Sequence, residues 1–279
     1  MVVKRPFSRR ALLRGAGIVA LGPFDVIALQ SAPGYGVTAL LEGTGMARIP
    51  PGEFEMGSPN GNADERPVHR VRISQGFEIG KCEVTQAQWD AVMRDAHAGR
   101  GATLVNSDGA EVSHNPSHFK GASLPVDSVS WVDVALFLKR LNARDSRHTW
   151  RLPNEAEWEY ACKVGSAEDA GLGATAWYKA NSGDQTQPVA TKTPNAWGLY
   201  DMQGNVAEWV QDWYSPDYYE NSPEADPKGP ETGPETSYRV FRGSCWHSTS
   251  ENCRTAIRGF DFPVSRFDYV GFRLVRTAK

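Results

Sequence analysis

The stretch RLPNEAEWEYACKVG, residues 151–165, carries a recognisable helix start. Asn154 is followed three residues later by Glu157, the spacing at which a capping side chain and an acidic side chain satisfy free backbone N–H groups. Trp158 and Ala161 then recur at the spacing of one helical face. The stretch therefore predicts a short helix that turns Trp158 into a core.

Two further helix starts flank this one in the chain. Thr85 precedes Gln88 and Ser130 precedes Asp133 at the same spacing, and apolar residues at helical spacing follow each pair. Trp89, in the first of these helices, is also expected in the core. The sequence predicts three short helices set among many turns.

Strands and one long loop are expected elsewhere. Alternating apolar and polar residues predict strands at 54–56, 68–73, 238–242 and 272–275. Residues 214–237 are rich in Pro, Glu, Asp and Ser without a period, which predicts a long surface loop.

Composition limits the classes of function. The 279 residues carry a net charge of −3, so no global basic field exists to attract a phosphate backbone, and nucleic acid is not expected as the main partner. No apolar run approaches the roughly 20 residues that cross a bilayer. Nine Trp, nine Tyr and eleven Phe supply ample apolar area for a core. A soluble globular protein without a membrane span is predicted.

The first 45 residues differ from the rest and are interpreted as a basic leader and linker. The first 14 contain five basic and no acidic residues, and a mostly apolar stretch follows at 16–29. The run from Ser8 to Arg14 resembles a twin-arginine export signal. Pro23 and Asp25 interrupt the apolar part. Export to the periplasm or cell surface and a cytoplasmic protein with a basic leader both stay open.

Four cysteines are too few to build a fold of this size from disulfides. They form no C-x-x-C pair, so a structural zinc site is not expected. Cys245 and Cys253 lie eight positions apart, and a turn could bring them together. Whether they form a disulfide stays open.

Seven blocks of the chain resemble, in order, the sulfatase-modifying-factor family, which includes formylglycine-generating enzymes and non-catalytic relatives. The blocks are RIPPGEFEMGSP (48–59), DERPVHRVRISQGFEIGKCEVTQAQW (64–89), LPVDSVSWVDVALFLKRLN (124–142), RLPNEAEWEYACKVG (151–165), NAWGLYDMQGNVAEWVQDWY (195–214), YRVFRGSCW (238–246) and GFRLVR (271–276). The resemblance implies a single α+β domain over 46–279 with a C-type-lectin-like fold, little regular secondary structure and few short helices.

The catalytic pair of that family is not reproduced. Its enzymes hold copper between two cysteines with four residues between them, since soft Cu(I) favours thiolates. Here seven residues separate Cys245 from Cys253. The resemblance therefore implies no copper and no catalytic residues, with Cys253 as a core thiol or a partner to Cys245.

The C-terminal segment 246–273 resembles a subgroup of the family, the variable proteins that retroelements diversify. A frame of fixed and changeable places, of the type W-n-n-n-x-x-n-C-R-x-A-n-R-n-n-n-n-P-x-n-R-n-n-n-x-G-F-R, matches it without a gap. The fixed places hold Trp246, Cys253, Arg254, Ala256, Arg258, Pro263, Arg266, Gly271, Phe272 and Arg273. The changeable places hold His247, Ser248, Thr249, Ile257, Gly259, Phe260, Asp261, Phe262, Ser265, Phe267, Asp268 and Tyr269, to which we add Val264. Asn252 is interpreted as an unchanged template residue.

The residues themselves support a binding surface there. The run GFDFPVSRFDY (259–269) holds three Phe, one Tyr and two Asp without a helical or strand period. Aromatic rings among short polar groups give large contact area at low entropic cost. A loop that packs into the core is the alternative. The fixed arginines would then support the backbone by binding carbonyls or carboxylates.

A calcium site is implied by the resemblance in GLYDMQGNVAEW (198–209). The ligands would be the Asp201 side chain, the carbonyls of Gly204 and Val206, and the Glu208 carboxylate, because hard oxygen ligands suit Ca²⁺. The alternative is that both acids cap or pair within the turn.

Taken together, these patterns predict a non-catalytic protein that displays a hypervariable C-terminal surface to another protein or a cell-surface component. Two alternatives stay open: a copper-dependent formylglycine-generating oxidoreductase and an accessory binding domain of fixed specificity.

Overall fold

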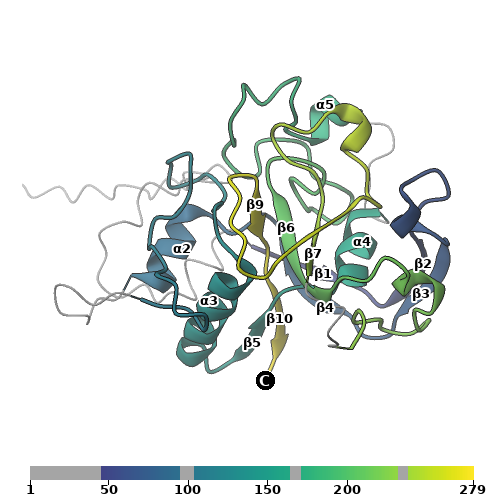
Figure 1. The fold of residues 1–279 in the computed structure, drawn as a ribbon, viewed down its shortest axis with the longest axis horizontal. Helices are drawn as coiled ribbons and strands as arrows, with labels where there is room; N and C mark the ends of the chain where they lie inside the picture. The colour runs from purple at the N-terminus through teal and green to yellow at the C-terminus, as the bar shows by residue number, and fades with distance from the viewer. Residues whose placement is uncertain (1–44, 95–103, 164–170, 232–237) are drawn as a thin grey trace, which may run out of the picture. The chain divides into compact units, whose positions relative to one another are not determined.

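Three sheets and three main helices organise the chain in a computed structural model, which describes residues 45–94, 104–163, 171–231 and 238–279 (Figure 1). The predicted leader lies outside the described residues, so export stays a prediction. Within the described ranges no helix is both long and apolar enough to span a membrane.

The helices begin where their capping residues predict. α2 (Gln86–Met93) follows Thr85 and α3 (Trp131–Arg144) follows Ser130, each with a complete capping box. α4 (Glu155–Lys163) begins after Asn154, whose backbone N–H donates to the Glu157 carboxylate at 2.8 Å. The expectation for these three starts is confirmed, because capping is a local interaction between residues three apart. A further single-turn helix, α5 (Leu172–Thr175), was not predicted.

The first two sheets are formed mainly by strands from the first part of the described chain. One has the order β1-β4-β10-β5, formed by β1 (Met46–Ile49), β4 (Phe77–Gly80), β10 (Val275–Ala278) and β5 (His148–Arg151). The second pairs β2 (Gly52–Met56) with β3 (His69–Ile73), as the alternation at 54–56 and 68–73 predicts.

The third sheet carries the C-terminal segment. Its order is β8-β7-β6-β9, formed by β8 (Arg258–Asp261), β7 (Arg239–Arg242), β6 (Ala207–Trp213) and β9 (Val270–Phe272). Figure 1 shows β6, β7 and β9 between α3 and α4. β6 and β9 are parallel and the other pairs antiparallel. β8 is therefore an edge strand, although the sequence analysis saw no strand period at 259–269.

The prediction of a single strand at 272–275 is wrong. β9 ends at Phe272 in one sheet and β10 begins at Val275 in another. The reason lies in Arg273, which is fully buried and binds Glu208 of β6, while the Leu274 carbonyl accepts the Gly80 N–H at 2.8 Å. The chain changes sheets here because these non-local contacts outweigh its local alternation.

The loop expected at 214–237 is only partly a surface loop. Among its described residues, Tyr218–Glu220 form a 3₁₀ turn, η3, that buries Tyr219 to 2% exposure. The ring of Tyr219 lies 4.4 Å from the Arg258 guanidinium, so this segment packs inward against β8.

Two apolar clusters form the core. One contains Trp158 with residues of β2, β3 and β4, and the other contains Trp89 with Phe137 and Phe272. Trp158 and Trp89 are both fully buried, as predicted.

Candidate ligand-binding surface

Exposed apolar side chains gather in the C-terminal segment. Among the described residues, the large hydrophobic side chains classed as exposed are Val105, Phe260, Phe262 and Val264, with 53%, 40%, 48% and 56% exposure. Three of these four lie at alternate positions within five residues. Adjacent exposed apolar groups of this kind mark interaction sites more often than scattered ones do.

Two tyrosines outside the segment extend this group into an aromatic patch, defined here as Tyr214, Tyr238, Phe260 and Phe262. Phe260 stacks on Tyr214 with ring centroids 3.7 Å apart. Tyr238 contacts Phe260 at 5.5 Å and Phe262 at 4.6 Å. Neither tyrosine was predicted from the sequence as part of a binding surface. They flank the irregular stretch 214–237, where the end of one strand and the start of the next could have indicated them.

A second group of rings includes three further changeable places. His247 lies 5.0 Å from Tyr269, and Tyr269 lies 5.0 Å from Phe267. Trp246 joins His247 at 4.6 Å and reaches Phe119 at 5.5 Å. Through Phe119, the rings of the C-terminal segment thus contact an earlier part of the chain.

Burial separates the changeable from the fixed places. Each of the thirteen changeable places, from His247 to Tyr269, is exposed or half-buried. The fixed places that are buried are Cys253, Ala256, Arg258, Gly271, Phe272 and Arg273, whereas Trp246, Arg254 and Pro263 are half-buried and Arg266 is exposed. Among the fixed and changeable places, only fixed ones are therefore buried, but four of the ten fixed places lie at least partly at the surface.

Gly271 and Gly259, one fixed and one changeable place, both lie in close contact with other residues. A Cβ atom at Gly271, a fixed place, would lie 2.3 Å from the Val126 carbonyl oxygen, so only glycine fits. A Cβ atom at Gly259, a changeable place, would lie 2.0 Å from the Phe241 ring. Any side chain at 259 therefore requires Phe241 to move.

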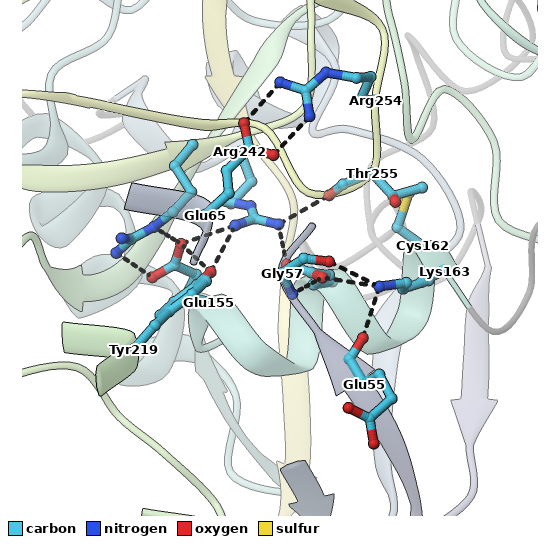
Figure 2. Close-up of polar contacts among 12 residues, drawn as sticks. Glu55, Gly57, Glu65, Glu155, Cys162, Lys163, Tyr219, Arg242, Arg254 and Thr255 are labelled. Carbon is cyan, nitrogen blue, oxygen red and sulfur yellow. Dashed lines mark hydrogen bonds and ion pairs between the residues drawn. The ribbon is translucent and has the colours of Figure 1, made fainter. Parts of the chain in front are cut away.

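Each of the four fixed arginines binds a carboxylate on an earlier element. Arg254 binds Glu65 through two hydrogen bonds of 2.6 Å, as Figure 2 shows. Arg266 binds Asp133 at 2.7 and 2.9 Å. Paired hydrogen bonds between a guanidinium and a carboxylate fix orientation as well as position.

The other two arginines are fully buried. Arg258 binds Glu155 at 2.7 and 3.0 Å, and Arg273 binds Glu208 with two bonds of 2.6 Å. Burial opposes the charge of Glu155, but Arg258 and Arg242 hold its pKa below the ordinary value. The segment is therefore tied to α4 and β6 by paired, buried charges.

The cysteines give no sign of a reactive pair. All four are free and buried. Burial raises the pKa of Cys245, and it raises the pKa of Cys253 to about 11. Cys245 Sγ lies 3.2 Å from Ser248 Oγ, and Cys253 Sγ donates to the Thr249 carbonyl at 3.4 Å. The neutral thiols therefore act as small polar contacts within the scaffold.

The residues of the expected calcium site are arranged differently from a ligand set. Both oxygens of Glu208 bind Arg273, and one also accepts the Trp158 indole N–H at 2.6 Å. Three hydrogen bonds thus fall on the two oxygens of Glu208. Among the described residues, no group of three or more His, Cys, Asp and Glu side chains could hold a metal ion.

Asp201 keeps one buried oxygen without a hydrogen-bond partner. Its other oxygen accepts the Ala190 N–H at 2.8 Å. Burial raises its pKa to about 6, with nearby Glu208 adding to the shift. Calcium binding through Asp201, Gly204, Val206 and Glu208 stays a prediction.

Comparison with known proteins identifies the family. Residues 37–278 match the model of the sulfatase-modifying factor enzyme 1-like domain, and the chain belongs to this family. The formylglycine-generating enzyme of Streptomyces coelicolor is 32% identical over 298 residues, covering 84% of this chain and 90% of that protein. The serine/threonine-protein kinase Pkn1 of Chlamydia trachomatis serovar L2 is 32% identical over 253 residues. That match covers 85% of this chain but only 39% of the kinase.

The solved structure of Treponema denticola variable protein 1 is also similar, with a TM-score of 0.68 and 29% identity. The match covers 82% of this chain and 94% of that protein. The fold is the α+β, C-type-lectin-like fold with few short helices that the sequence predicts. Because these relatives include both an enzyme and a variable protein, the site must decide the function.

The pairing of Arg254 with Glu65 can be tested through pH. Burial raises the pKa of Glu65, but hydrogen bonds from Arg254 and the Asn62 N–H outweigh it and hold that pKa below the ordinary value. The stabilisation is therefore present above the unfolded pKa of about 4.3 and is lost as pH falls through the folded pKa. We expect Arg254→Met to lower the free energy of unfolding by about 2 kcal/mol at pH 7.

In that variant the Asn62 N–H still binds Glu65, but the hydrogen bonds and charge of Arg254 are gone, so the pKa of Glu65 rises and the loss should shrink as pH falls to about 3.5. Urea denaturation at several pH values measures this. Arg94→Met is the control, because Arg94 and Asp90 form an exposed pair worth about 0.5 kcal/mol or less. A loss independent of pH would contradict the assignment.

Proposed function

We propose that this chain is a non-catalytic binding protein whose segment 246–273 presents a diversified surface to another protein or a cell-surface component. The concentration of exposed Phe260, Phe262 and Val264 at changeable places carries this proposal. Burying these apolar side chains against a partner is favourable, because it removes their surface from water.

The scaffold beneath supports the same proposal. Arg254, Arg258 and Arg273 hold the segment to carboxylates on separate elements, and these contacts position the backbone beneath the exposed side chains. A rigid scaffold beneath an exchangeable surface is the arrangement that binding loops require. The similarity to Treponema denticola variable protein 1 is consistent with it.

The enzyme alternative is less well supported by the thiols. A copper-dependent oxidation of cysteine would need two thiolates that reach one ion. Here burial raises the pKa of both Cys245 and Cys253, which disfavours the thiolate. The two thiols also already form polar contacts within the protein, Cys245 with the Ser248 hydroxyl and Cys253 with the Thr249 carbonyl.

The diversification can be tested at the locus. We expect the neighbouring DNA to contain a reverse-transcriptase gene and a near-copy of the segment encoding 246–273, with Asn codons at changeable places. Related strains should differ at those places and agree at Arg254, Arg258 and Gly271. Differences spread evenly over the segment, with no near-copy, would favour an accessory domain of fixed specificity.

A copper titration separates the proposal from the enzyme. The reduced protein, titrated with Cu(I) against a competing chelator at pH 7, should bind no stoichiometric copper through Cys245 and Cys253. The variant Cys245→Ser with Cys253→Ser is the control and should behave identically. Tight one-to-one binding that this variant abolishes would contradict the non-catalytic proposal.

A further inference from the structure

A cleft of about 510 Å³ opens beside Phe260, and most of its lining residues lie outside the places taken from the sequence. Its walls come from residues around the 3₁₀ turn η2 (Ala63–Glu65), from the segment leading into η3, and from β8. Phe260 and Tyr214 form its aromatic side. The cleft therefore adjoins the aromatic patch and continues the proposed binding surface inward.

The polar lining of the cleft is mainly acidic. Asp64, Asp217 and Glu220 contribute carboxylates, and Arg66 and Arg258 contribute guanidinium groups. The charge of Arg258 is already matched, because its fully buried side chain binds both oxygens of Glu155, a residue outside the lining. The carboxylates facing the cleft therefore outnumber the remaining guanidinium.

The acidic side chains of the cleft are placed where a positively charged group of a ligand can reach them. Asp217 and Glu220 are exposed, so a ligand reaches them without rearrangement of the scaffold. Asp64 is positioned from the inside, because its carboxylate accepts the Tyr214 hydroxyl at 3.1 Å. Acid groups at the rim and a fixed acid beside Tyr214 complement one positive charge.

The aromatic wall suits the stem of a long basic side chain. Phe260 is 40% exposed and is held flat against Tyr214. Lysine and arginine bury their methylene groups along apolar surface while the charged end stays among polar groups. The ring faces also attract a cation within about 6 Å.

We propose that the cleft accepts a basic side chain, lysine or arginine, from a protein partner. The stem lies along Phe260 and the charged end meets Asp64, Asp217 and Glu220. The inference rests on the proposed function and narrows it to a protein with an exposed basic residue. A neutral ligand would leave the acidic rim uncompensated. Because Phe260 occupies a changeable place, diversification would alter the wall while the acids stay.

Short peptides test this directly. The probes are acetyl-Gly-Lys-Gly-amide and acetyl-Gly-norleucine-Gly-amide, which share a four-carbon stem and differ in the ammonium group. Titration of the isotope-labelled full-length chain, followed by amide chemical shifts, should show saturable shifts at 217–220 and 258–262 with the lysine peptide only. Raising salt from 20 to 300 mM should weaken the binding, because these charges are exposed.

The double variant Asp217→Asn with Glu220→Gln should weaken lysine-peptide binding by about threefold or more, since each exposed pair contributes up to about 1 kcal/mol. Neither residue belongs to the buried arginine network, so folding should be unaffected. Glu55→Gln removes an exposed acid outside the cleft and is the matched control. It should bind as the unmodified chain does.

Three outcomes would overturn the inference: no saturable shift at the cleft, equal shifts from both peptides, or binding unchanged in the double variant. Shifts confined to the region of His247 and Tyr269 would also reject the cleft but leave a binding surface in place. The proposed function itself stands or falls on the locus and the copper titration, which do not involve these peptides.

Discussion

Arg242 is the buried charge on which the C-terminal half of the structure depends. It lies at the end of β7, fully buried, and binds Glu155 and Glu159 of α4 together with the Thr255 carbonyl (Figure 2). Arg258 of β8 shares Glu155. Removing one member would leave another charge buried without a partner, at a cost of about 3–5 kcal/mol. α4 therefore fixes β7, which leads into the segment 246–273, and β8, which lies within it.

The position of the exposed rings follows from this network. Glu155 holds β8 in place through Arg258. Phe260, in the same strand, is thereby positioned to stack on Tyr214, which directly follows β6. Asp133 and Glu208 hold the later part of the segment through Arg266 and Arg273. These arginine contacts use none of the side chains at the changeable places, although a side chain at Gly259 would require Phe241 to move.

Local signals in the sequence predicted local structure well. The three capping pairs located the helices, because each pair lies three residues apart on one chain segment. The break at Arg273 and the burial of Tyr219 could not be predicted, since each depends on partners distant in the sequence. For the same reason the arginines were predicted as supports, but their carboxylate partners were not.

The candidate surface was predicted in part. A resemblance to a diversified family predicted the changeable places, and three of them, Phe260, Phe262 and Val264, carry exposed apolar side chains. The cleft was missed because Asp64 and Asp217 lie about 150 residues apart, and no spacing in the chain reveals that they face one space.

The central claim is that the surface varies independently of the scaffold. Its most direct test is the free energy of unfolding, by urea denaturation, of two variants. Thr249→Asn with Phe262→Asn and Val264→Asn should change it by less than about 1 kcal/mol, because all three side chains are exposed. Arg258→Gln should lower it by about 3 kcal/mol or more, because Glu155 loses a buried partner. Equal losses in the two variants would contradict the account.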